Sequence, residues 1–318
     1  MIFLSVVPAF LSAFAISVMS TWLLVVVLQK KRMFVAVKPE LLIQDQRKSR
    51  TPFFGGIAFL VAVTACFFIF MDFRSPKVYI PLFSLWVFSI AGFCDDVLKL
   101  RSDNGDGFTV KQKSASQIFA AVLVVFLIIW KDFDVTKSRF IFGRESDFGI
   151  WYVLPAAFFL VFYVNALNIT DGVDGLASCS TIPVLLAISL MGWGTQFGMM
   201  PWVVIGTLGG FLVFNHSPAR IFMGDVGSHG LAGLIGAMAL LMRKDLLLLV
   251  CSILFCIELL SSLIQILSIR ILKKKVFAIA PLHHLLEHHG MPAWKIVLLF
   301  TSINVMGSLI ALAIWRLS

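Results

Sequence analysis

Long apolar runs constrain the fold of this sequence more than any other feature. There are ten of them, and each is long enough, or nearly so, to cross about 30 Å of hydrocarbon as a helix. Only 14% of the residues are charged and 59% are hydrophobic, whereas soluble domains average roughly 25% and 45–50%. Barrel strands would be shorter and would alternate, so we predict an all-α, polytopic integral membrane protein with one domain over residues 1–318. The predicted spans are residues 3–28, 54–71, 78–94, 115–130, 150–166, 176–193, 200–214, 229–242, 245–269 and 294–315.

Basic residues indicate the orientation of the spans. The loops after odd-numbered spans carry sixteen Lys and Arg, and the even-numbered loops with the C-terminal tail carry nine. Because cytoplasmic loops are enriched in Lys and Arg, the odd loops are predicted to be cytoplasmic and both termini to lie outside. The net charge of +9 then reflects topology and attraction to the lipid bilayer, and we expect no nucleic-acid partner.

Polar clusters that suit chemistry all fall in the odd-numbered loops. Incidental turn residues would scatter over both sides, so this collection predicts a single site on the cytoplasmic side, assembled from five loops. The clusters are Thr51-Pro52 with Gly55-Gly56, Asp95-Asp96 with Lys111-Gln112-Lys113, residues 165–176, residues 215–228 and residues 281–290. On the other side, partial alternation in residues 131–149 predicts a small external hairpin.

The most concentrated cluster lies between the fifth and sixth spans. It contains Asn165, Asn168, Asp171 and Asp174, which recur every three residues and so fall near one face of a helical path. Gly172 and Gly175 allow the backbone to turn there or to approach a ligand closely. The alternative interpretation is a polar turn that joins two buried helices.

Two further clusters are acidic. Adjacent carboxylates at Asp95 and Asp96 repel each other unless a cation, a shared proton or a basic partner such as Lys99 offsets the repulsion. Alternatively, the pair is a solvated helix end. Asp225 lies between two glycines, on a turn that suits Mg²⁺, and its alternative role is to cap the next helix.

Four of the six histidines, together with Glu287, lie within residues 283–289. The HExxH order of a zinc protease is absent, so donors to a phosphate or nucleotide are as plausible as a zinc site. Glu258 is near the middle of the ninth span, where an acid costs roughly 2.5–3.5 kcal/mol, and must face protein. Ser261, Ser262 and Gln265 are nearby on the helix, and a structural hydrogen bond and a lipid-phosphate or proton role are equally open.

Several acids, lysines and histidines at a membrane surface, without a Cys or Ser nucleophile motif, favour Mg²⁺-assisted phosphoryl transfer. In such a site Mg²⁺ bridges a diphosphate, lysine neutralises developing charge, and an aspartate takes a proton or orients the nucleophile. A site at the inner face of a membrane would also join a cytosolic nucleotide substrate to a lipid substrate.

The motifs resemble those of the polyprenyl-phosphate N-acetylhexosamine-1-phosphate transferases over nearly the whole chain. The matching stretches are residues 51–56, 92–99, 108–113, 165–177 and 222–228, together with Glu258, Gln265 and residues 280–284. The ten-span layout also agrees. Within that family the chain looks most like the branch that makes lipid I of peptidoglycan.

The resemblance implies substrates, a cofactor and roles. It implies transfer from UDP-MurNAc-pentapeptide to undecaprenyl phosphate with Mg²⁺, in a bacterial cytoplasmic (inner) membrane, and homodimerisation stays open. Catalytic roles fall to Asp95, with Asp95 as the base, and to Asp96, Asp171 and Lys113, while Asp225 and Asp171 hold the metal. The residues expected to bind substrate are Asn165, Asn168, Asp174, His283, His284, Glu287, Thr51 and Gly56.

One departure keeps alternatives open. The lipid I branch usually has three consecutive histidines, and this chain has Leu285 in the third position. The resulting pattern also resembles the branch that transfers GlcNAc-1-phosphate from UDP-GlcNAc to undecaprenyl phosphate. A proton-coupled transporter is a more distant alternative, because among the acids only Glu258 is central in a span and no repeat is visible.

Overall fold

The structure is a computed structural model that describes residues 2–31, 33, 51–102, 105–131, 136–139 and 145–317. It is all-helical apart from one short hairpin, in which β1 (Lys137–Arg139) pairs antiparallel with β2 (Glu145–Asp147). The hairpin was predicted, and residues 140–144, which fall between its strands in sequence, lie outside the described residues. The helices are α1 (Ile2–Lys30), α3 (Gly56–Phe70), α4 (Pro76–Arg101), α5 (Val110–Lys131), η3 (Gly149–Tyr152), α6 (Val153–Thr170), α7 (Leu176–Met191), α8 (Gln196–Asn215), α9 (Gly224–Leu241), α10 (Asp245–Cys251), α11 (Ile253–Leu272), α12 (Leu282–His288) and α13 (Ala293–Leu317).

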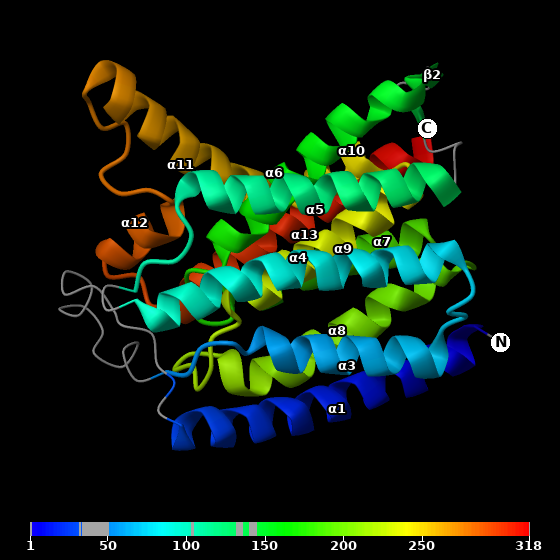
Figure 1. Ribbon diagram of the computed structural model, residues 1–318, viewed down its shortest axis with the longest axis horizontal. Coiled ribbons are helices and arrows are strands. Elements are labelled where there is room, and N and C mark those ends of the chain that lie inside the picture. Colours follow the sequence, from blue (N-terminus) through cyan, green and yellow to red (C-terminus); the bar gives the residue numbers. More distant parts are fainter. Residues whose placement is uncertain are drawn as a thin grey trace.

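Nine predicted apolar segments each coincide with one α-helix and the remaining one with two, which confirms a polytopic helical membrane protein. In the part of the chain that the structure describes, eight helices are long and apolar enough to cross a membrane, and α3 and α7 are shorter apolar helices. The exact number of spans and their orientation stay predictions. α1 begins and α13 ends at the same end of the bundle (Figure 1), as an even number of crossings requires.

Several predicted boundaries differ from the structure. α4 continues seven residues past the predicted end at 94, and α9 begins five residues before the predicted start at 229. Asp95, Asp96 and Asp225 therefore lie in helical turns, not in flexible loops. The ninth predicted span is two helices, α10 and α11, with Ser252 between them. Asn304 of α13 compensates for this break, because its side-chain oxygen accepts a hydrogen bond from the Leu254 N–H in the first turn of α11.

The helix α9 lies at the centre of the molecule. All its residues are buried, and it packs most extensively on α4. Small residues permit this close approach, because a methyl group at Gly92 of α4 would lie 2.2 Å from the Asp225 carbonyl oxygen. The contact brings the end of α4 beside the beginning of α9.

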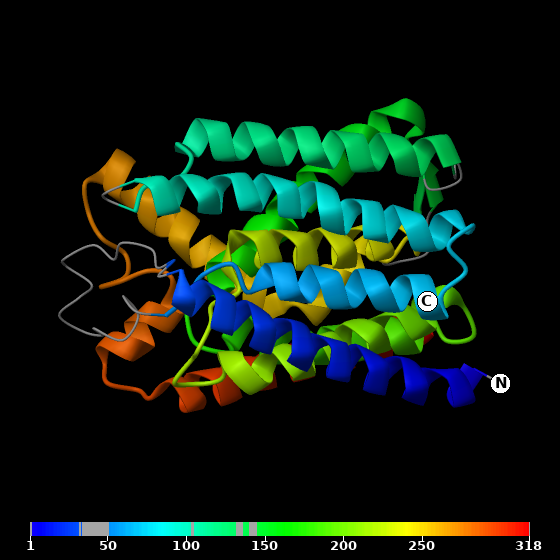
Figure 2. The same cartoon turned by 60° about the horizontal axis from the view of Figure 1, so that its bottom comes forward.

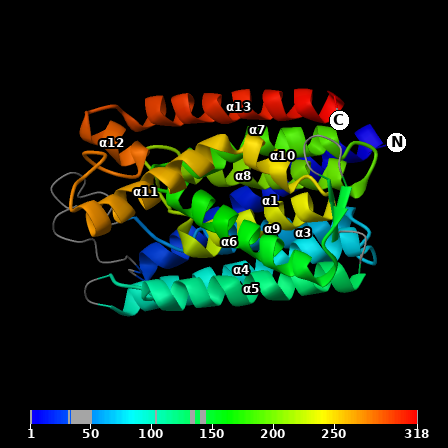
Figure 3. The same ribbon diagram turned by 90° about the horizontal axis from the view of Figure 1, so that it is seen from above.

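The remaining helices surround this pair. α1 runs along α3 and α8 on one side (Figure 2), while α13 and α5 lie on opposite flanks (Figure 3). α11 leans away from the bundle at the end opposite the termini, and α12 lies at that same end (Figure 1). The C-terminal ends of α4 and α6 and the N-terminal ends of α5 and α9 also meet there.

Candidate active site

Three carboxylates meet inside the protein at this end. Asp95 and Asp96 come from the last turns of α4, and Asp225 comes from the first turn of α9. Oxygens of all three lie within 4.8 Å of one another, and all three residues are buried. Like charges in so small a volume require cationic partners.

Two lysines supply that charge. The Lys99 ammonium lies 2.9 Å from Asp95 Oδ2, 3.3 Å from Asp96 Oδ1 and 2.9 Å from Asp225 Oδ2. The Lys113 ammonium, from the first turns of α5, also donates to Asp225 Oδ2 and lies 3.3 Å from Asp95 Oδ2. With three carboxylates ionised, the cluster keeps one net negative charge.

Backbone N–H groups hold the remaining oxygens of the α4 pair. The Phe108 N–H donates to Asp95 Oδ1, and the Val226 N–H, at the start of α9, donates to Asp96 Oδ2 at 3.0 Å. The segment before α5 approaches Asp95 so closely that a methyl group at Gly107 would lie 2.2 Å from Asp95 Oδ1. Asp95 and Asp96 are therefore fixed in orientation.

Asparagine and glutamine side chains extend the network across α5, α6 and α9. The Asn168 amide donates to Asp225 Oδ1 and to the Ser228 hydroxyl, both at 2.8 Å. One turn earlier on α6, the Asn165 amide donates to Gln117 at 2.8 Å, and Gln117 lies 2.9 Å from His229 Nε2. Asn168 thus contacts the carboxylate cluster directly, and Asn165 supports it from the protein interior.

Asp171 and Asp174, which share one sequence motif, have different surroundings in the turn after α6. Asp174 accepts a hydrogen bond from the Ala219 N–H at 3.0 Å, which ties this turn to the segment before α9. Among the described residues, no hydrogen bond or ion pair to the Asp171 carboxylate is found. Partial burial, with the negative charges of Asp225, Asp96 and Asp174, raises the pKa of Asp171 well above its usual value.

The histidine segment packs against the same turn. His283 Nδ1 lies 2.8 Å from Glu258 Oε2, and both side chains are buried. A methyl group at Gly172 would lie 2.2 Å from His283 Nε2, so only glycine fits there. His284 and Glu287 form a second pair on α12, also at 2.8 Å but partly exposed to solvent.

The two substrate-binding residues predicted near the N-terminus of α3 lie in different surroundings. The Gly56 N–H donates to the Met223 carbonyl at 2.8 Å, and a methyl group at Gly56 would lie 2.2 Å from the Gly227 nitrogen. Gly56 is therefore in the packing contact that supports the start of α9. Thr51 is half-buried at the beginning of the described stretch.

The structure brings together Asp95, Asp96, Lys113, Asn168 and Asp225, which the sequence singled out. Asp171, predicted as a second metal ligand, is not one of the three carboxylates close enough to share one ion. The Glu258 side chain bonds to His283, and the Ser261 hydroxyl bonds to the backbone oxygen of Glu258.

Sequence reasoning missed several polar residues of the network. It considered Lys99 only as a partner of the adjacent aspartates, it gave Ser228 no role within its motif, and it overlooked Gln117 and His229. A helical-spacing signal existed for two of these, because Gln117 follows Lys113 by four residues and His229 follows Asp225 by four.

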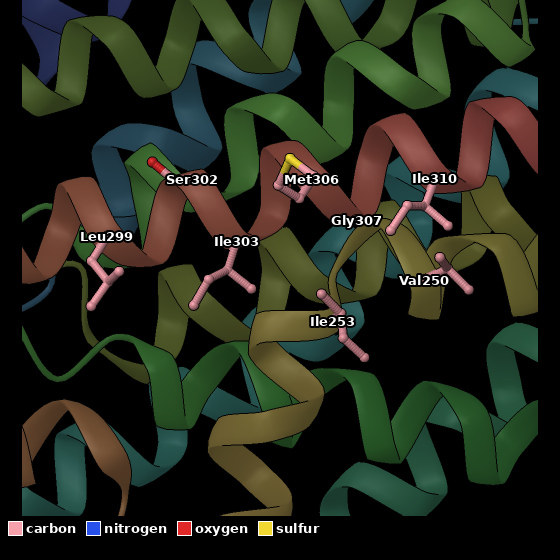
Figure 4. A pocket seen from close by; sticks show the side chains of 8 residues that line it. All are labelled: Val250, Ile253, Leu299, Ser302, Ile303, Met306, Gly307 and Ile310. Atoms are coloured by element: carbon pink, nitrogen blue, oxygen red, sulfur yellow. The ribbon is translucent and has the colours of Figure 1, made fainter.

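An apolar cleft lies elsewhere in the molecule. It has a volume of about 500 Å³ and lies between α13 and the α10–α11 junction (Figure 4). Its lining residues are Val250, Ile253, Leu299, Ser302, Ile303, Met306, Gly307 and Ile310. None of them is ionisable, so this cleft is not the site of the chemistry.

The carboxylate cluster fits a hard divalent cation. Mg²⁺ is typically held by one or two carboxylates together with water and substrate phosphate oxygens. Asp95, Asp96 and Asp225 offer such oxygens around one buried point. The two lysine ammonium groups provide further cationic partners for a phosphate.

These features define a class: a polytopic helical membrane protein with a buried carboxylate–lysine cluster at one end of its bundle. Comparison with known proteins identifies the family. The model of glycosyl transferase family 4 matches residues 78–243, a stretch that contains the three carboxylates and both lysines, and the chain belongs to this family.

Relatives resemble the chain over most of its length. A protein of Listeria welshimeri is 32% identical, with 97% of each chain covered. Proteins of Lactiplantibacillus plantarum and Streptococcus pneumoniae are each 34% identical, covering 84% and 85% of this chain and 85% and 86% of their own. All three relatives carry the name phospho-N-acetylmuramoyl-pentapeptide-transferase.

Proposed function

We propose that this protein transfers phospho-MurNAc-pentapeptide from UDP-MurNAc-pentapeptide to undecaprenyl phosphate, giving lipid I and UMP. The observation that carries the proposal is the cluster of Asp95, Asp96 and Asp225 held by Lys99 and Lys113. It combines oxygen ligands for a cation with ammonium groups that can neutralise phosphate charge, and phosphoryl transfer uses both. The shared name of the relatives supports the choice of substrates.

The reaction joins the lipid phosphate to the sugar phosphate. An oxygen of undecaprenyl phosphate attacks the phosphorus next to the sugar, and the bond from that phosphorus to the bridging oxygen breaks. UMP leaves with the bridging oxygen. Mg²⁺, when bound, neutralises diphosphate charge and polarises the P–O bond that breaks.

The residues of this chain position the reactants and balance charge. Asp95 accepts any proton on the lipid phosphate and, with Asp96, orients that group, while Asp225 is the principal metal ligand and Asp171 lines the diphosphate site. Lys113 neutralises charge that develops on the phosphates. Because Lys99 and Lys113 already contact the carboxylates, substrate oxygens replace some of these contacts when they enter.

The turn at residues 171–175 and the histidine segment form the nucleotide-sugar side. Asn168 extends from the carboxylate cluster toward this side, and Asn165 and Asp174 support it. His283, His284 and Glu287 contact the nucleotide sugar. Thr51 and Gly56 form the side of the site next to α3. Gly56 acts indirectly, by packing against the start of α9.

The excess of Lys and Arg in odd-numbered loops supports a site that faces the cytoplasm of a bacterial inner membrane. A cytosolic nucleotide sugar and a membrane-embedded polyprenyl phosphate then reach it from different directions. Homodimerisation of the chain is compatible with this arrangement.

UDP-GlcNAc is a second candidate donor. The observation that favours it is Leu285, which stands where the lipid I branch usually has a third histidine. The pentapeptide-bearing donor remains the first choice because the full-length relatives carry its name.

A donor comparison tests the proposal. The purified protein in detergent with undecaprenyl phosphate and Mg²⁺ is expected to release UMP from UDP-MurNAc-pentapeptide. Release from UDP-GlcNAc alone would transfer the assignment to the second donor, and release from neither would exclude the transferase activity. Asp225→Asn is expected to abolish Mg²⁺-dependent turnover, so normal turnover of this variant at ordinary Mg²⁺ would remove Asp225 from the metal site.

A further inference from the structure

A buried acid–imidazole pair lies beside the site, and the chemistry described so far gives its acid no role. Glu258 is fully buried on α11 and His283 is 1% exposed on α12, and they meet at 2.8 Å. The two residues are 25 positions apart in sequence, so the contact also joins α11 to the histidine segment.

One nitrogen of this pair finds no hydrogen-bond partner among the described residues. His283 Nδ1 bonds to Glu258, but in the described part of the chain nothing bonds to the buried His283 Nε2 or to the buried Glu258 Oε1. A buried polar atom left without a partner costs about 1–3 kcal/mol, so a partner supplied by a ligand relieves a real penalty. Nε2 lies against Gly172, in the turn that begins with Asp171.

Glu258 determines what Nε2 can do. A carboxylate accepts hydrogen bonds and cannot donate when ionised, so the proton of the neutral ring lies on Nδ1. Nε2 then carries the lone pair and faces the 171–175 turn as an acceptor. A carboxylate that fixes the tautomer of a histidine in this way also fixes the ring's orientation.

We propose that Glu258 is a positioning residue that holds His283 so that Nε2 accepts a hydrogen bond from the nucleotide-sugar substrate. The partner is a hydroxyl or amide N–H of that substrate, bound beside the 171–175 turn. Because this role concerns the nucleotide-sugar side of the transferase, it rests on the proposed function. Glu258 acts only through His283 and does not touch the substrate.

Paired substitutions separate positioning from simple packing. His283→Asn keeps a polar atom near the place of Nδ1, and so keeps the bond to Glu258, but removes Nε2. Glu258→Gln keeps the shape but lets the ring adopt either tautomer. Each variant is expected to lower kcat/KM for the nucleotide sugar by about 10- to 100-fold, with an unchanged KM for undecaprenyl phosphate.

The decisive readout is the double variant. If Glu258 acts through His283, adding Glu258→Gln to His283→Asn lowers kcat/KM no further. Multiplied losses in the double variant would overturn the proposal, as would single variants that lower only the unfolding temperature. Ser261→Ala, which removes a hydroxyl bonded to the backbone oxygen of Glu258, is the matched control and is expected to retain kcat/KM.

A spectroscopic measurement adds an independent check. Nitrogen-15 NMR of histidine-labelled protein distinguishes protonated from unprotonated ring nitrogens, and the signals that His283→Asn removes identify His283. The native ring is expected to carry its proton on Nδ1, and Glu258→Gln to mix the tautomers. A proton on Nε2 in the native neutral ring would contradict the proposal. Failure of the native protein to turn over any nucleotide sugar would instead refute the proposed function itself.

Discussion

Replacing Lys99 with Met tests the electrostatics of the carboxylate cluster. Lys99 contacts all three carboxylates at 2.9–3.3 Å, and its side chain is 21% exposed. Two unit charges 4 Å apart interact by about 4 kcal/mol at an effective dielectric constant of 20. Methionine keeps the length of the side chain and removes the charge, which leaves Lys113 as the remaining ammonium against Asp95, Asp96 and Asp225.

The expected loss of stability follows from the uncompensated carboxylate charge that Lys99→Met leaves. Breaking a buried ion pair typically costs about 3–5 kcal/mol, because it leaves an uncompensated charge. Partial exposure of Lys99 places the effect near the lower end, at about 3 kcal/mol. A bound cation replaces the missing charge, so Mg²⁺ at a hundred times its Kd is expected to restore about 2.7 kcal/mol.

The assay is unfolding of the purified protein in EDTA and over a series of Mg²⁺ concentrations. Lys99→Met is expected to unfold earlier than the native protein in EDTA and to gain more from Mg²⁺. Lys111→Met removes an exposed charge near the same end of α5 and serves as the control, with a change of less than about 0.5 kcal/mol. Equal stability of Lys99→Met and the native protein in EDTA would refute the reasoning.

Two further substitutions test the turn after α6. Asp171→Asn is expected to stabilise the fold near neutral pH while lowering turnover, since the raised pKa of Asp171 means that its ionisation opposes folding. That gain should vanish as the pH falls below about 4, where the carboxyl becomes protonated in the unfolded state as well, and a less stable variant at pH 7 would contradict it. Gly172→Ala places a methyl group 2.2 Å from His283 Nε2 and is expected to cost about 1–3 kcal/mol in a denaturant titration. Gly209→Ala meets nothing closer than 3.4 Å and is expected to cost no stability, so a similar loss in both variants would rule out the contact with His283.

The helices and the gathering of polar clusters were predictable because their signals are local. Apolar runs mark the spans, and motif spacing marks Asp95, Asp96, Asn168 and Asp225. The helical extensions of α4 and α9 were missed because their polar residues interrupt hydropathy. Inside the protein these residues are paired with lysines and backbone N–H groups, which offsets the cost of burying them.

The pairings within the site depend on how helices cross. Lys99 reaches Asp225 across 126 residues only because Gly92 lets α4 approach the start of α9. The bond between Glu258 and His283 depends on where α12 lies after the loop that follows α11. Asp174, which shares a motif with Asp171, instead bonds to a backbone N–H, and spacing alone does not separate the two roles.

The fate of the donor's two phosphates tests the central claim most directly. The native protein is mixed with undecaprenyl phosphate, Mg²⁺ and UDP-MurNAc-pentapeptide labelled at the phosphate next to the sugar. Transfer of phospho-sugar predicts that the label appears in the lipid fraction and that unlabelled UMP is released in equal amount. Labelled UDP in the aqueous fraction, or UMP release that does not depend on the lipid, would contradict it.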